Sequence, residues 1–195
     1  MRLKQVPVSP VIPLGFGQPR VSPREVDFSL PKELVVWDLR AVKILALYIS
    51  EGHNFVGHHG KPASDYQIME KTAIECVSGK GIRGDRFFDY KTDFKGQITF
   101  FSYEVGMQLF QDLKIEKVDL TLLRRNVITE GVDLNQWIGQ KFEIQGVEFQ
   151  GVEECKPCYW MDQAIGVGAE AMLKGNGGLR AKILCDGVLK KSDQS

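Results

Sequence analysis

The sharpest chemical feature of this sequence is a pair of cysteines separated by two residues, Cys155-Lys156-Pro157-Cys158. A thiolate is both a nucleophile and a ligand for soft metals, and nearby positive charge favours the thiolate over the thiol. Lys156 places such a charge between the two cysteines. The segment therefore indicates metal, sulfur or redox chemistry.

The cysteine pair has four interpretations. A structural zinc site needs four ligands, and the other cysteines, Cys76 and Cys185, are isolated in the sequence. A thioredoxin-like redox pair belongs on a strand-to-helix turn of a βαβ unit, whereas this motif follows an expected hairpin. Two packed structural thiols are a third interpretation, because free cysteine buries readily. We favour the fourth, one working cysteine in a pocket with the other as its neighbour or redox partner.

The three histidines of the chain lie together, at His53, His58 and His59, in a segment that also holds three glycines. Clustered imidazoles suit metal binding or the wall of a polar pocket. Their spacing matches no helical metal motif, and the glycines indicate a loop. A solvated loop is an equally good interpretation.

Arginines recur beside glycines or at expected strand starts. Gly81-Ile82-Arg83-Gly84-Asp85-Arg86 places two arginines on a glycine-rich turn, Arg124-Arg125-Asn126 precedes a strand, and Arg180 follows a glycine-rich loop at 175–178. Glycine lets a backbone approach a ligand closely, and arginine binds phosphate in a bidentate manner. Solvated turns explain each segment equally well when it is taken alone, and Asn126 could instead hold a turn.

The elements that must position these groups are mostly short strands. The patterning predicts strands at 42–49, 71–77, 97–101, 125–129, 141–144, 147–153, 180–184 and 188–190. Helices are expected at 103–113 with Ser102 as N-cap, at 134–138 after Asp133, and around 169–173. Hairpin turns are expected at 145–146 and at 185–187, where Asp-Gly is typical of a type I′ turn. The predicted fold is mainly β, a barrel or sandwich with a few short helices.

Composition limits the classes of partner. The chain has 195 residues with 25 basic and 25 acidic side chains, so it lacks the cationic surplus that nucleic-acid binding needs. No apolar stretch reaches the length of a membrane span, and no secretory signal is visible, so we expect neither nucleic acid nor membrane as a partner. The expected location is the cytoplasm.

Six of the eight prolines fall before residue 40. Proline fixes φ and lacks a backbone donor, so residues 1–38 are expected to form an extended arm and residues 39–195 the folded domain. Deleting the arm should change the melting temperature little, because it adds no regular structure. Thermal melts of the full-length and shortened chains test this, and a large drop on truncation would show that the arm belongs to the core.

Read in order, four blocks of the sequence resemble the MOSC family, which is named for the C-terminal domain of molybdenum cofactor sulfurase. The blocks are the glycine-aspartate-basic turn at 81–86, the Arg/Asn strand at 124–131, the hairpin at 138–158 that delivers a cysteine, and the closing hairpin at 177–187. The resemblance covers most of residues 42–193. It implies a distorted MOSC-type β-barrel, as in a stand-alone bacterial-type member.

The resemblance also implies a site. Cys158 takes the position of the family's functional thiol, a molybdenum ligand in some members, whereas cysteine is not required at position 155. The residues expected to bind the molybdenum cofactor (molybdopterin) are Arg83, Asp85, Arg86, Arg125, Asn126 and Arg180. Asn176 departs from the family pattern, where many members have a basic residue, and no role for the histidines follows from the resemblance.

Three functions are consistent with this site. The first is an oxidoreductase that holds the cofactor through Cys158 and reduces N-oxygenated small molecules with an external electron-donor protein. The second is a sulfur carrier or sulfurtransferase that bears a persulfide on Cys158 and takes its sulfur from a donor protein. The third is a non-catalytic cofactor carrier. The sequence favours cofactor binding.

Overall fold

The structure is a computed structural model that describes residues 42–54 and 62–193. The arm predicted at 1–38 lies outside these residues, as do His58 and His59, so the predictions for them stand as predictions. None of the described helices is long and apolar enough to cross a membrane.

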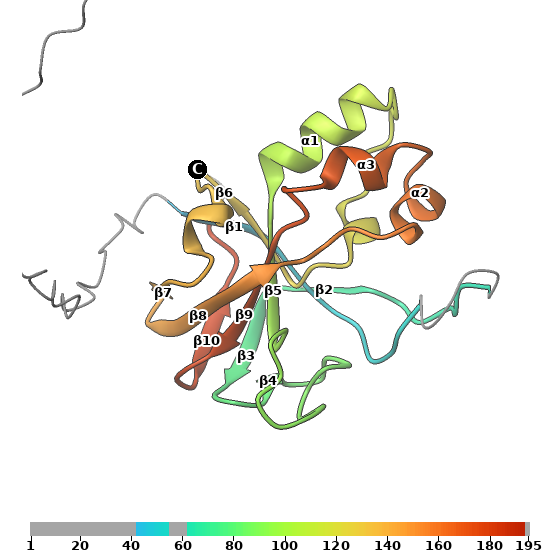
Figure 1. Ribbon diagram of the computed structural model, residues 1–195. Coiled ribbons are helices and arrows are strands. Elements are labelled where there is room, and N and C mark those ends of the chain that lie inside the picture. The colour runs from blue at the N-terminus through green and yellow to red at the C-terminus, as the bar shows by residue number, and fades with distance from the viewer. Residues whose placement is uncertain (1–41, 55–61, 194–195) are drawn as a thin grey trace, which may run out of the picture. The chain divides into compact units, whose positions relative to one another are not determined.

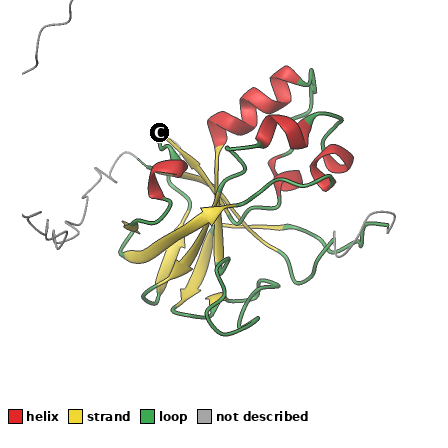
Figure 2. Ribbon diagram, in the orientation of Figure 1, coloured by secondary structure: helices red, strands yellow, loops and turns green. Residues whose placement is uncertain are grey.

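The described residues are mainly β, with two sheets and a few short helices (Figure 2). The strands are β1 (Lys43–Ile49), β2 (Met69–Lys71), β3 (Ala73–Val77), β4 (Gly81–Ile82), β5 (Ile98–Ser102), β6 (Val127–Glu130), β7 (Lys141–Ile144), β8 (Val147–Glu154), β9 (Leu179–Ile183) and β10 (Gly187–Lys190). The helices are α1 (Tyr103–Asp112), α2 (Trp160–Ala164) and α3 (Ala169–Leu173), with short 3-10 helices η2 (Leu120–Leu123) and η3 (Leu134–Trp137). This confirms the predicted fold class.

The larger sheet is the central layer of the molecule. It has seven strands in the order β2-β1-β6-β5-β9-β8-β7, and β5 and β6 pair in parallel across α1. One face packs against the smaller sheet, β10-β3-β4, in a core that includes Phe100, Ile74 and Leu189. The other face packs against the helices, with Phe101 beside Leu109. Figure 1 shows α1, α2 and α3 gathered together on one side. The large sheet stays open, and the two sheets together form a distorted, barrel-like shell around the first core.

Two local predictions are confirmed in detail. The Ser102 hydroxyl accepts a hydrogen bond from the Val105 N–H at 3.2 Å and caps α1. Strands β7 and β8 form the predicted hairpin, because Gln145 (φ 53°) and Gly146 (φ 80°) both adopt the left-handed conformation that a two-residue turn requires. This hairpin leads directly into the cysteine segment.

Two predicted strand arrangements are wrong. The strand predicted at 71–77 is divided at Thr72, so that β2 joins the large sheet and β3 the small one. The hairpin predicted at 185–187 does not form, because β9 is already paired with β5 and β8 on both edges and β10 pairs with β3 instead. The Asp186 carboxylate accepts from the Ser78 N–H at 2.7 Å, so it anchors a crossover between the sheets.

Candidate functional site

A pocket of about 200 Å³ opens between the large sheet, α2 and the loops that follow β4 and β8. Cys158, Arg86, Arg125 and Arg180 all line it, so four of the residues predicted from the sequence lie together. The remaining lining residues are His53, Phe87, Phe94, Gly96, Thr99, Arg124, Cys155, Lys156, Pro157, Trp160 and Met161. Five cationic side chains therefore line the same pocket as the two cysteines, with aromatic rings forming part of the wall.

The two cysteines of the pair are held differently. Cys155 is 3% exposed, and its N–H donates to the Gly178 carbonyl at 2.7 Å. Cys158 is exposed, and its carbonyl accepts from the Met161 N–H at 2.8 Å in the first turn of α2. Of the two, only Cys158 presents an accessible thiol at the pocket.

Arg86 provides a buried cation in the wall of the pocket. Its side chain is 9% exposed, lies over the Phe87 ring at 5.0 Å and contacts the Asp85 carboxylate at 3.4 Å. The Nε atom is buried with no hydrogen-bond partner among the described residues. Burial lowers the pKa of Arg86, and the Asp85 carboxylate, which acts in the opposite direction, and the lowering charge of Arg125 contribute less. A bound anion would satisfy this side chain.

Arg124 is a pocket residue that the sequence-based site prediction does not include. Burial, and then the charges of Arg86 and Arg125, lower the pKa of Arg124 to about 10. The residue ends η2 in the left-handed conformation (φ 58°) and so moves the start of β6 to Val127. The Arg-Arg-Asn triplet marks this position, but propensity does not predict a left-handed arginine.

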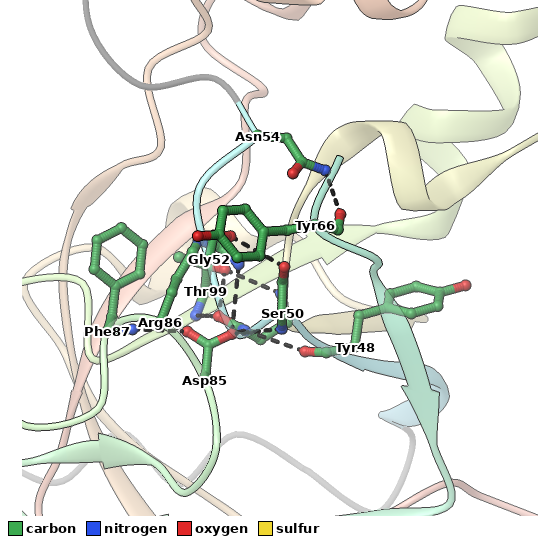
Figure 3. Close-up of polar contacts among 10 residues, drawn as sticks. Tyr48, Ser50, Gly52, Asn54, Tyr66, Asp85, Arg86, Phe87 and Thr99 are labelled. Carbon is green, nitrogen blue, oxygen red and sulfur yellow. Dashed lines mark hydrogen bonds and ion pairs between the residues drawn. The ribbon is translucent and has the colours of Figure 1, made fainter. Parts of the chain in front are cut away.

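Asp85 and Asn126 form a buried network beside the pocket. Figure 3 shows Asp85 among Ser50, Arg86, Phe87 and Thr99. The Asp85 carboxylate accepts from the backbone N–H groups of Ser50 and Phe87, both at 3.1 Å, and from Asn126 Nδ2 at 3.3 Å. The Asn126 carbonyl oxygen accepts from the Thr99 N–H at 3.1 Å. The sequence predicts cofactor contacts for both residues, whereas the structure places neither at the pocket surface. They fix the loop that carries Arg86.

Comparisons with known proteins identify the family of this chain. The sequence matches the family described as MOSC domain over residues 58–193, which is more than half of the chain. The chain belongs to the MOSC domain family. The family match confirms the resemblance on which the site prediction rests.

Solved structures share the fold of this MOSC domain. The YUAD protein from Bacillus subtilis is 17% identical, with a TM-score of 0.60 and coverage of 77% of this chain and 91% of that chain. YiiM from Geobacillus stearothermophilus is 11% identical, with a TM-score of 0.54 and coverage of 76% and 71%. YiiM from Escherichia coli is 13% identical, with a TM-score of 0.50 and coverage of 80% and 70%. No curated protein sequence matches the chain.

Arg83 lies outside the pocket of this MOSC domain, contrary to the sequence-based prediction. Its side chain is 58% exposed, and its Nε donates to the Glu75 carboxylate at 2.8 Å. Asp85 N–H closes the turn onto the Ile82 carbonyl at 3.0 Å, and Gly84 has a φ of 81°. The turn thus separates a surface arginine at position 83 from a buried one at position 86.

Arg180 and His53 complete the wall of the MOSC pocket. Arg180 Nη1 lies 3.4 Å from the Glu153 carboxylate, at the exposed rim. The His53 ring meets Phe87 edge-on at 4.7 Å between ring centroids. Partial burial, and then the charges of Arg86 and Arg124, lower the pKa of His53. The neutral imidazole is therefore the favoured form in the ligand-free pocket.

The other two cysteines are remote from the pocket of the MOSC domain. Cys76 is fully buried, and this burial raises the pKa of its thiol to about 12. Cys185 is partly exposed and accepts from the Glu148 N–H at 3.2 Å. Within residues 42–54 and 62–193, no group of three or more His, Cys, Asp or Glu side chains is placed to hold a metal ion. The structure thus offers no support there for the four-ligand zinc interpretation.

Proposed function

We propose that this MOSC domain binds the molybdenum cofactor, with Cys158 as the protein's ligand to the metal, and reduces N-oxygenated small molecules. The observation that carries the proposal is the juxtaposition of the exposed Cys158 with four arginines that line the same pocket. Soft metals select thiolates, and arginines select phosphates.

The donor set fits the chemical groups of this cofactor. The cofactor combines a dithiolene-bound soft metal with a phosphate, so it calls for one thiolate and a separate cationic site. Cys158 supplies the thiolate, and the buried Nε of Arg86 supplies a donor with no partner among the described residues. The pocket, at about 200 Å³, is smaller than the roughly 300–1,000 Å³ typical of small-molecule sites, so part of a bound cofactor would remain in its open mouth.

The proposed reaction is a two-electron reduction. The N–O bond of the substrate breaks, two electrons and two protons are taken up, and the oxygen leaves as water. When bound, the cofactor would supply the two-electron redox chemistry, and an external donor protein would restore the electrons. The residues of the pocket would bind and orient the cofactor and the substrate. The arginines would hold the negatively charged groups of the cofactor, and the rings of Phe87, Phe94 and Trp160 would exclude water from part of the pocket.

Metal and pterin analysis of protein purified from a cofactor-competent host tests the proposal. We expect close to one molybdenum and one pterin per chain, together with turnover of an N-hydroxylated compound in the presence of an artificial electron donor. Bound cofactor without turnover would indicate a carrier. A persulfide on Cys158 without molybdenum would indicate a sulfur carrier, which an exposed thiol also permits.

Substituting the pocket arginines gives a quantitative test. Arg86→Ala or Arg180→Ala should weaken cofactor binding by about 1–3 kcal/mol, the scale of charge-assisted hydrogen bonds. Equilibrium dialysis with fluorescence detection of the pterin measures this change. Arg83→Ala is the matched control, because its guanidinium pairs with Glu75 outside the pocket. Equal weakening by the Arg83 and Arg86 variants would contradict the assignment of the anion site.

A further inference from the structure

Arg125 ties three backbone segments together beside the pocket. Its Nε and Nη2 atoms donate to the Gly177 carbonyl at 3.0 and 2.8 Å, and Nη2 also donates to the Cys155 carbonyl at 3.1 Å. Its Nη1 atom donates to the Leu123 carbonyl at 2.7 Å. Every nitrogen of this guanidinium therefore already binds backbone. The side chain links the end of η2, the cysteine segment and the loop before β9.

The cysteine segment and the loop before β9 approach each other backbone to backbone. A Cβ atom added at Gly177 would lie 2.2 Å from the Cys155 carbonyl oxygen. One added at Gly178 would lie 2.3 Å from the Phe100 carbonyl oxygen, and Gly178 has a φ of 95°. These contacts leave no room for a side chain, so both glycines are required by packing. They bring the Gly177 and Cys155 carbonyls within reach of one guanidinium.

The short segment from Cys155 to Cys158 is held at both ends. The Arg125 bond and the Cys155 N–H bond to Gly178 fix its beginning. The bond from the Met161 N–H to the Cys158 carbonyl fixes its end at α2. Pro157 restricts φ between these anchors. These contacts fix the backbone from which the Cys158 thiol projects. The Arg125 side chain makes one of them, to the Cys155 carbonyl.

We propose that Arg125 is a positioning residue, which holds the cysteine segment in one conformation so that the Cys158 thiol faces the pocket. The inference rests on the proposed function insofar as Cys158 is the working thiol. It corrects the role implied by the family resemblance, in which Arg125 binds the cofactor directly. Arginine is suited to this task because its planar fork reaches several carbonyls at once, whereas lysine carries the same charge on one nitrogen.

Cysteine alkylation in ligand-free protein tests the proposal. Wild type, Arg125→Lys and Arg125→Gln are treated with iodoacetamide under native conditions, and each cysteine is followed by peptide mass spectrometry. In wild type, Cys158 should react and Cys155 should stay protected. In both variants the rate at Cys155 should rise by at least about tenfold, because loss of a charge-assisted bond favours local opening. Cys76 should stay protected and so report an intact core.

One further variant and a second measurement separate positioning from charge. Arg180→Gln removes a charge from the exposed rim of the pocket and makes none of the Arg125 contacts, so Cys155 should stay protected. Cofactor retention should fall equally in Arg125→Lys and Arg125→Gln, since the lysine restores charge but not the paired bonds. Rescue by lysine, or exposure of Cys155 in Arg180→Gln, would overturn the proposal.

The remaining outcomes of the alkylation experiment also test the proposal. If Arg125→Gln unfolds, Cys76 will react as fast as Cys155, and Arg125→Lys then settles the question alone. An unchanged Cys155 rate in a folded Arg125→Lys variant would overturn the proposal. The alkylation assay uses no cofactor, so a failure of molybdenum binding in wild type would refute the proposed function and leave this result standing.

Discussion

Cys158→Ser should abolish bound molybdenum while leaving the fold intact. Among the described residues that line the pocket, Cys158 carries the one exposed soft ligand, and a serine hydroxyl is a poor ligand for a soft metal. The side chain is exposed, so the free energy of unfolding should change by less than about 0.5 kcal/mol. Metal content and melting temperature, measured in parallel, test both halves of the prediction.

Cys155→Ser is the matched control, since it makes the same chemical change three residues away. The backbone of Cys155, rather than its thiol, makes the contacts that fix the segment. This variant should keep its molybdenum and lose about 1–2 kcal/mol of stability, because a hydroxyl replaces a buried thiol. Equal loss of metal in both variants would favour a paired zinc or disulfide role and refute ours.

Asp85→Ala should have the largest effect on stability. The Asp85 side chain is 2% exposed and is the ion-pair partner of Arg86, which is itself buried. Removing the carboxylate leaves this cation without its ion-pair partner and the backbone N–H groups of Ser50 and Phe87 without their acceptor. Breaking a buried pair in this way costs about 3–5 kcal/mol. Urea unfolding measures the loss.

The exposed Asp89, which lies 3.9 Å from Lys80, provides the control for Asp85. Asp89→Asn should change stability by less than about 0.5 kcal/mol, because asparagine tolerates the left-handed conformation of this residue (φ 53°) and only a surface pair is lost. Asp85→Asn should fall between the two, since it keeps an acceptor oxygen and loses the charge. A loss below about 1 kcal/mol for Asp85→Ala would show that the network beside the pocket is dispensable.

The sequence predicts those features whose causes are local. Ser102 caps α1 and Gln145-Gly146 turns a hairpin through interactions among neighbouring residues. The choice of Cys158 over Cys155 comes from the family resemblance, and the structure is consistent with it in exposing the thiol of Cys158 at the pocket. The hairpin predicted at 185–187 is wrong because the local turn propensity competes with strand pairing to β3, more than a hundred residues away in the sequence.

The roles of the arginines and acids depend on tertiary structure. Arg83 and Arg86 lie on one turn and are chemically identical, yet one pairs with Glu75 on the surface and the other is buried at the pocket. Nothing in the residue types separates Asp85, a buried anchor, from a ligand-binding acid. Arg124 lines the pocket from the left-handed position that ends η2. Such assignments require the fold.

The pairing of β10 with β3 has a consequence for biosynthesis. Residues 187–190 complete a sheet begun by residues 73–76, so the smaller sheet cannot form until more than a hundred further residues have been translated. Until then one side of the core around Ile74 and Ile82 lacks its cover from Leu189. Long-range pairings of this kind slow folding and leave apolar surface exposed to aggregation. Synthesis of β10 therefore determines whether the nascent chain can complete this core or continues to expose it to chaperones.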